Sequence, residues 1–206
     1  MREEPRRIDG RLEATLRIPD VEPRAVAVVL HPLPTHGGTM RNPLIAAIAR
    51  ACAERGMLAL RVNFRGTEES AGEFTGGERE HEDVAAAVDH ARSLGATLPA
   101  AVAGFSFGAL MTLKWMAGGG RPDAYALAGV PLRSASLAPQ DLPPVPDGAF
   151  IVQAERDQFG TAAEVRARYP RARVREIAGV DHFFIGKFRE VGDLIAASLA
   201  HDLRID

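Results

Sequence analysis

The sequence has little of what several common protein classes require. Cys52 is the only cysteine, which excludes a disulfide framework or a cysteine metal cluster and favours a reducing compartment. The 25 basic and 27 acidic residues nearly balance, so no basic surface attracts nucleic acid. No stretch approaches the roughly 20 apolar residues that span a bilayer, and the charged first residues lead into no signal-like apolar segment. We therefore expect a cytoplasmic protein that binds neither nucleic acid nor membrane, with its oligomeric state left open.

The 206 residues, 46% of them hydrophobic, suit a single domain over residues 1–206 with a sizeable core. Apolar runs alternate with helical patterns, which predicts an α/β fold with a mainly parallel, twisted sheet covered by helices on both faces. An antiparallel edge of two strands around an Asp9-Gly10 turn is expected within residues 8–18. Further strands are expected at residues 25–30, 57–62, 100–103, 125–130, 149–154 and 172–177, and helices at 43–55, 78–94, 109–116, 161–169 and 186–203.

Residues 131–148 contain five prolines and little periodicity, so we expect an irregular connection there. In open parallel sheets, ligands bind beyond the carboxyl ends of the strands. The loops that follow residues 30, 62, 104, 130, 154 and 177 should therefore converge on one site.

The most informative stretch is Gly104-Phe105-Ser106-Phe107-Gly108, which lies between an apolar strand pattern and a helical pattern. G-x-S-x-G in this context is typical of a nucleophile elbow, where the two glycines let strand and helix approach closely while the serine hydroxyl is presented at the sheet edge. Ser106 is therefore the candidate nucleophile.

A serine nucleophile needs a base, and the base needs an orienting acid. His182 follows the last predicted strand and is the candidate base, whereas His201 falls near the end of the final helix. Asp157 and Glu155 both follow the strand at residues 149–154. Asp157 is preferred because it lies deeper in the loop, while Glu155 adjoins the strand end. Asp181 adjoins the histidine, and Asp141 falls in the proline-rich connection, so both are weaker candidates.

The oxyanion of an acyl-transfer intermediate needs preorganised N–H donors. We expect one from the backbone of Phe107 and the second from the loop after residue 30. Pro32 and Pro34 have no N–H, which leaves Leu33 as the natural donor.

Histidines elsewhere do not predict a metal site. His31 and His36 have no further ligands at suitable spacing around them. His81-Glu82-Asp83 and His90 fall on a helix at spacing that does not suit metal ligands, and we interpret them as a solvated face. We expect neither a metal nor a cofactor.

Taken together, these segments resemble the α/β-hydrolase superfamily, in particular its small bacterial, dienelactone-hydrolase-like members without a cap domain. The resemblance covers nearly the whole chain and implies Ser106 as nucleophile, His182 as base and Asp157 as acid. In the family, the loop His31-Pro32-Leu33-Pro34 commonly has a second histidine where this chain has Leu33. The matching segments lie at residues 31–34, 37–42, 63–66, 104–108, 155–157 and 181–184, with Ser70, Gly72 and Phe74.

The expected function is that of a serine hydrolase that cleaves a small carboxylic ester or thioester through an acyl-enzyme. A serine peptidase or acyltransferase with the same triad is the alternative, as is a binding protein that keeps the fold without turnover. Because residues 131–148 are too few for a cap domain, we expect a shallow cleft near Leu33, Phe107 and Phe183 that favours short acyl chains.

Overall fold

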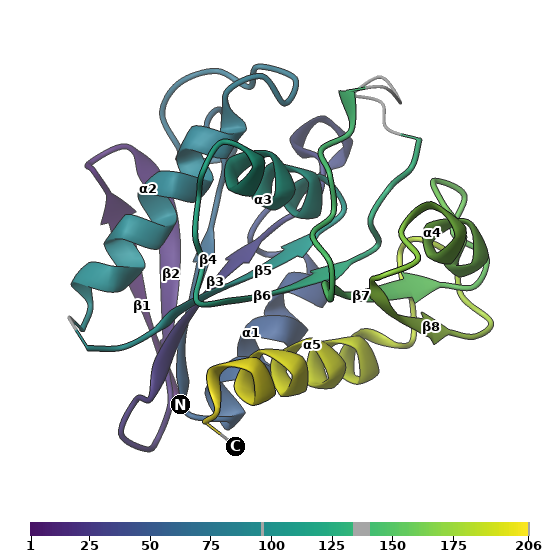
Figure 1. The fold of residues 1–206 in the computed structure, drawn as a ribbon. Helices are drawn as coiled ribbons and strands as arrows, with labels where there is room; N and C mark the ends of the chain where they lie inside the picture. The colour runs from purple at the N-terminus through teal and green to yellow at the C-terminus, as the bar shows by residue number, and fades with distance from the viewer. Residues whose placement is uncertain (96, 134–140, 206) are drawn as a thin grey trace.

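The computed structural model describes residues 1–95, 97–133 and 141–205. It contains an eight-stranded sheet with the order β1-β2-β4-β3-β5-β6-β7-β8 (Figure 1). In this order, neighbouring strands from β4 to β8 are parallel, whereas β2 is antiparallel to both β1 and β4. The expected α/β architecture is confirmed. The strands are β1 (Arg2–Ile8), β2 (Leu12–Ile18), β3 (Ala25–Leu30), β4 (Met57–Val62), β5 (Ala100–Phe105), β6 (Ala124–Ala128), β7 (Phe150–Ala154) and β8 (Arg173–Ile177).

The first strand lies earlier than the sequence pattern predicted. The pattern placed two strands within residues 8–18, but β1 occupies Arg2–Ile8 and precedes the Asp9-Gly10 turn. Its polar composition hid it, because β1 pairs only with β2 and its outer edge and much of its surface face solvent. Pro5 is tolerated there because an edge strand does not need every N–H for pairing.

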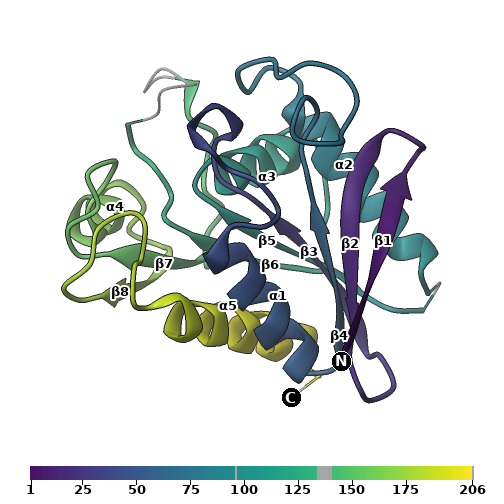
Figure 2. The same ribbon diagram turned by 180° about the vertical axis from the view of Figure 1, so that it is seen from behind.

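Helices cover both faces of the sheet (Figures 1 and 2), with α1 and α5 on one face and α2 and α3 on the other. The side chains of β3 alternate accordingly, so that Val29 packs in the core beside α1 and α5 while Val28 packs beneath α2 and α3. The helices are α1 (Pro43–Glu54), α2 (Glu80–Ser93), α3 (Phe107–Ala117), α4 (Ala162–Arg168) and α5 (Phe188–Leu203), with a short 3-10 helix η1 (Pro34–His36).

Most element boundaries fall within two residues of those expected. Helix α2 begins at Glu80 rather than residue 78, and strand β6 ends at Ala128 rather than residue 130. Of the irregular connection expected at residues 131–148, residues 134–140 lie outside the described residues. Within the described chain, no helix is both long and apolar enough to traverse a lipid bilayer.

Candidate active site

Ser106 occupies a sharp turn between β5 and α3. Its backbone has φ 54° and ψ −112°, a conformation that L residues other than glycine rarely adopt. The turn is anchored by the Ser106 N–H, which donates a 3.0 Å hydrogen bond to the carbonyl of Ala128 on β6. Such a strained turn at the carboxyl end of a central strand is the geometry expected of a nucleophile elbow.

The glycines on either side of Ser106 are required by close backbone contacts. A Cβ on Gly104 would lie 2.6 Å from the backbone of Gly108, and a Cβ on Gly108 would lie 2.4 Å from the carbonyl oxygen of Leu30. No side chain fits at either distance. The close approach of strand and helix that the sequence predicted is therefore present.

Ser106, His182 and Asp157 form a continuous chain of hydrogen bonds. Ser106 Oγ lies 2.8 Å from His182 Nε2, and His182 Nδ1 lies 2.8 Å from Asp157 Oδ2. Because an ionised carboxylate only accepts hydrogen bonds, Nδ1 carries the proton and Nε2 is free to accept from the serine hydroxyl. His182 and Asp157 are buried, and the second carboxylate oxygen of Asp157 accepts from the N–H of Phe159 at 2.9 Å.

The other candidate acids lie elsewhere. Glu155 is exposed, and its carboxylate accepts from the Gly179 N–H at 2.7 Å. Asp181 accepts from the N–H of Phe183, and Asp141 is exposed. Of the four carboxylates weighed from the sequence, Asp157 is the one that contacts His182.

A pocket of about 210 Å³ opens beside Ser106 and His182, with a mostly apolar lining. Loops after β3, β5, β6, β7 and β8 contribute to it, as expected; the loop after β4 does not line it. The lining residues are Pro32, Leu33, His36, Gly37, Gly38, Asn42, Phe105, Ser106, Phe107, Leu110, Pro131, Arg133, Phe159, His182 and Phe183.

Leu33 and Phe107, the two expected oxyanion donors, both line this pocket. Phe107 is the first residue of α3, where backbone N–H groups have no partner within the helix. The carbonyl of Leu33 accepts from the N–H groups of His36 and Gly38, both at 3.1 Å, which closes the loop around η1. Both N–H groups are thus carried on tightly folded backbone.

His31 controls the orientation of the Pro32–Leu33 peptide. Its Nδ1 lies 2.6 Å from the Pro32 carbonyl oxygen, and its Nε2 accepts from the Phe64 N–H at 3.1 Å, so the proton is on Nδ1. In a trans peptide the C=O and N–H point in opposite directions. Holding the Pro32 carbonyl against His31 therefore directs the Leu33 N–H away from His31.

Burial keeps His31 neutral. The side chain is fully buried, and desolvation lowers the pKa of its imidazole from 6.5 to about 4, against a smaller opposite effect of its hydrogen bond to Pro32. The ring also packs edge-on against Phe64, whose ring in turn packs edge-on against Phe107. Phe64 thus contacts His31, which holds the peptide that carries the Leu33 N–H, and Phe107, whose own backbone carries the other candidate donor.

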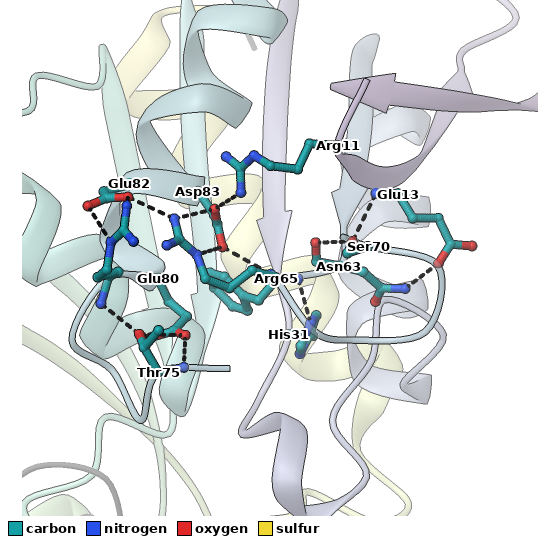
Figure 3. A network of polar contacts seen from close by, with 12 residues as sticks. Arg11, Glu13, His31, Asn63, Arg65, Ser70, Thr75, Glu80, Glu82 and Asp83 are labelled. Carbon is teal, nitrogen blue, oxygen red and sulfur yellow. Dashed lines mark hydrogen bonds and ion pairs between the residues drawn. The ribbon is translucent and has the colours of Figure 1, made fainter. Parts of the chain in front are cut away.

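The loop that carries Phe64 is anchored by a buried ion pair (Figure 3). The N–H and Nε of Arg65 both lie 3.0 Å from Asp83 Oδ2, while Arg65 Nη2 and Arg11 Nη1 each lie 2.8 Å from Oδ1. Asp83 is fully buried, and its hydrogen bonds raise the pKa of the Arg65 guanidinium. The network joins α2, the loop after β4 and the turn between β1 and β2.

This network corrects the interpretation of His81-Glu82-Asp83 as a solvated face. Asp83 and Glu80 are fully buried on α2, and Glu80 accepts from the N–H groups of Thr75 and Gly77. The signal was present in the spacing, because positions 80 and 83 lie one turn before the apolar Val84 and Ala87. Treating acidic residues near a helix start as solvated by default hid it.

No cluster of three or more potential metal ligands occurs among residues 1–95, 97–133 and 141–205. His31 and His36 have different partners. His31 contacts the backbone of Pro32 and Phe64, whereas His36 Nδ1 lies 3.1 Å from the hydroxyl of Thr35. The histidines on α2 include polar atoms, His81 Nδ1 and His90 Nε2, that are buried without a partner.

Solved structures of similar proteins share this architecture. An α/β serine hydrolase homologue from Coxiella burnetii is 27% identical, covers 97% of each chain and superposes with a TM-score of 0.81. XC6422 from Xanthomonas campestris, described as an α/β serine hydrolase without lid, is also 27% identical, with 94% of this chain and 88% of that chain covered and a TM-score of 0.78. The uncharacterized protein RP471 of Rickettsia prowazekii is 28% identical over 200 residues, which are 91% of this chain and 83% of the relative.

The fold and these relatives define a small α/β hydrolase, and residues 1–95, 97–133 and 141–205 contain no cap domain. A model of the family described as X-Pro dipeptidyl-peptidase (S15 family) matches residues 9–136. This is more than half of the chain, and the chain belongs to that family.

Proposed function

We propose that the protein is a serine hydrolase of small carboxylic esters or thioesters, with Ser106 as nucleophile, His182 as base and Asp157 as orienting acid. The observation that carries the proposal is the hydrogen-bonded chain from Ser106 Oγ through His182 to Asp157, with both distances 2.8 Å. The serine hydroxyl gives up its proton only to a positioned base, and this chain supplies one in the required tautomer.

In the acylation step, Ser106 Oγ attacks the carbonyl carbon of the substrate while its proton moves to His182 Nε2. The tetrahedral oxyanion accepts hydrogen bonds from the backbone N–H groups of Leu33 and Phe107. When the intermediate collapses, the imidazolium returns the proton to the departing alcohol or thiol. Water then attacks the acyl-enzyme with His182 again as base, and the acid and free Ser106 are released. No cofactor enters these steps.

The lining of the pocket supports a small apolar acyl group. Phe105, Phe107, Phe159 and Phe183 provide aromatic walls within a volume of about 210 Å³. Each buried methylene contributes about 0.8 kcal/mol only while apolar wall covers it. We infer that kcat/KM rises from acetate to about butyrate or hexanoate esters and falls for longer chains.

Family membership favours a dipeptidyl-peptidase as the second candidate. Such an enzyme binds a peptide by its free ammonium terminus, which a carboxylate would pair with most strongly. The described lining of the pocket contains no Asp or Glu. We therefore rank the ester or thioester substrate above a peptide with a free amino terminus.

A fluorophosphonate probe tests the nucleophile directly. Wild-type protein should be labelled, and Ser106→Ala should not, since its hydroxyl is gone. The matched control is Ser93→Ala, an exposed serine on α2 remote from the pocket, which should label like wild type. Labelling of Ser106→Ala would contradict the assignment.

The substrate class is then tested with p-nitrophenyl esters of graded chain length, acyl thioesters and Xaa-Pro p-nitroanilides. We expect turnover of short esters or thioesters and little of the anilides. A preference for the anilides would make the protein a peptidase, and a steady rise through palmitate would contradict the short acyl pocket.

A further inference from the structure

Gln153 is a polar residue near the carboxyl end of β7, a strand that is otherwise apolar. Strand β7 reads Phe150-Ile151-Val152-Gln153-Ala154, and the Gln153 side chain is fully buried. A buried amide that lost its hydrogen bonds would be destabilising, so its partners define what the residue does. Those partners are the backbone of Val130, the carbonyl of Gly160 and the carboxylate of Asp157.

The orientation of the Gln153 amide follows from the Val130 N–H, which lies 2.9 Å from Oε1 and requires an acceptor there. The Nε2 atom is then the donor, and it lies 3.0 Å from Asp157 Oδ2, 2.6 Å from the Gly160 carbonyl oxygen and 3.4 Å from the Val130 carbonyl oxygen. An amide nitrogen has two hydrogens. One is available for the Asp157 carboxylate, and the other for the backbone of the same loop.

The oxygen that Gln153 contacts is the one that contacts His182. Asp157 Oδ2 accepts from His182 Nδ1 at 2.8 Å and from Gln153, while Oδ1 accepts from the Phe159 N–H. The carboxylate is therefore held from three directions. Rotation that moved Oδ2 away from His182 would also break the bond from Gln153.

We propose that Gln153 is a positioning residue that holds the Asp157 carboxylate in line with His182 Nδ1. The proposal rests on the function proposed above, in which Asp157 orients His182. An amide suits this role because it supplies N–H donors without a charge. A cation in its place would neutralise Asp157 and weaken its stabilisation of the imidazolium formed during catalysis.

The charged groups that act on this site are few among the described residues. Asp157 and His182 are in contact, and the Arg133 guanidinium, paired with Glu164, interacts electrostatically with Asp157. Gln153, which is uncharged, lies between Asp157 and Val130 in the loop that follows β6.

Gln153→Met tests the hydrogen bond with a side chain of similar length and no donor. Side chains that orient metal ligands contribute about 10- to 100-fold to activity, and by analogy kcat should fall by about that factor with KM nearly unchanged. The control is Asp123→Ala, which removes a 2.7 Å side-chain bond to the Ala100 N–H at the opposite end of the sheet. It should lower thermal stability without lowering kcat comparably.

Gln153→Glu provides a signature that a purely structural role would not give. The introduced carboxyl can accept from Val130, but faces Asp157 Oδ2 where a donor is needed. Two carboxylates in contact share a proton, so protonation at low pH restores a donor and ionisation at higher pH removes it. The ratio of Glu-variant to Met-variant kcat should therefore rise as pH falls, read across the pH range in which kcat of the wild type and of the Met variant is constant. If the Met variant does not fold, the ratio of Glu variant to wild type should show the same trend.

A ratio that does not change with pH would overturn the proposal, as would equal losses of kcat in Gln153→Met and Asp123→Ala. A wild type without labelling or turnover would instead overturn the proposed function. The positioning itself is then read from the downfield proton resonance of His182 Nδ1–H. This resonance should be present in wild type and lost or shifted in Gln153→Met, and an unchanged resonance would refute the role of Gln153 independently of activity.

Discussion

Asp83 and Asp157 are both buried carboxylates, but their partners differ in charge. Asp83 receives hydrogen bonds from two guanidinium groups, those of Arg65 and Arg11. Asp157 receives them from Gln153, the backbone of Phe159 and His182, and within the described residues its one ion pair is with His182. A carboxylate whose charge is balanced by guanidinium groups links separate segments of the chain. A carboxylate held by uncharged donors keeps its negative charge available to stabilise an imidazolium.

The two carboxylates also stabilise different parts of the proposed site. Asp83 acts indirectly, because it holds the loop that contains Phe64 and Arg65. The N–H of Phe64 donates to His31, and His31 in turn contacts the carbonyl of the Pro32–Leu33 peptide. Asp157 contacts His182 itself. The same chemical change, Asp to Asn, should therefore give opposite results at the two positions.

Asp157→Asn should give the largest effect on activity. An asparagine can donate to Nδ1 and favour the wrong imidazole tautomer, and in a serine protease this change lowers kcat by about 10⁴. We expect a similar loss in ester turnover, with little change in the midpoint of urea unfolding. Glu155→Gln, in the same loop, is the control and should retain most activity. If the glutamine variant lost more activity than the asparagine variant, Glu155 would be the orienting acid.

Asp83→Asn should give the larger effect on stability. Breaking a buried ion pair by removing one partner typically costs about 3–5 kcal/mol, and here the buried Arg65 would be left with its ion pair to the solvent-exposed Glu82. Urea unfolding should show this loss, while kcat of the folded protein should fall far less than in Asp157→Asn. Glu82→Gln is the matched control, since Glu82 also pairs with Arg65 but is exposed to solvent. A stability as high as that of the wild type would show that Asp83 is not the anchor of this loop.

His31, which contacts the loop of the candidate oxyanion donor Leu33, should make the free energy of unfolding depend on pH. Its pKa is lowered from 6.5 to about 4 in the folded protein, so as pH falls through this window the unfolded chain takes up a proton that the folded chain does not. Stability is thus greatest above the unfolded pKa and declines towards pH 4. At about 1.4 kcal/mol per unit, the loss is about 3 kcal/mol.

Urea unfolding of wild type and His31→Gln between pH 7 and pH 4 measures this contribution. The variant lacks the titrating group and should lose less stability on acidification, although it starts from a lower value. His201→Gln, at an exposed position on α5, is the comparison variant for the loss of a histidine outside the core. Parallel curves for wild type and His31→Gln would contradict a neutral, buried His31.

The sequence predicted the parts of the site whose chemistry is local. The elbow depends on Gly104 and Gly108 within a few residues of Ser106, and His182 and Asp157 each lie in the loop that follows a strand pattern. Chain order and strand ends were enough to select them as candidates. The choice of Asp157 over Glu155 was a matter of reach within one loop, and the structure places the Asp157 carboxylate beside His182.

The positions that sequence reasoning misjudged or passed over are buried polar residues whose partners lie far along the chain. Asp83 was interpreted as solvated, although Arg65 and Arg11 hold it. Gln153 carried only a weak signal, a polar residue in an apolar strand. Strand β1 was hidden for a related reason, since its polar residues become a strand only through pairing with β2.

By itself, then, the sequence determined the alternation of strands and helices, the strained serine turn and the order of serine, acid and histidine, because hydrophobic periodicity and glycine requirements act over short distances. Only the tertiary structure decided which buried polar groups pair with which: Asp83 with Arg65, His31 with Pro32 and Phe64, and Gln153 with Asp157. A buried polar group is stable with any partner that satisfies its hydrogen bonds, and composition does not say which one the fold brings within 3 Å.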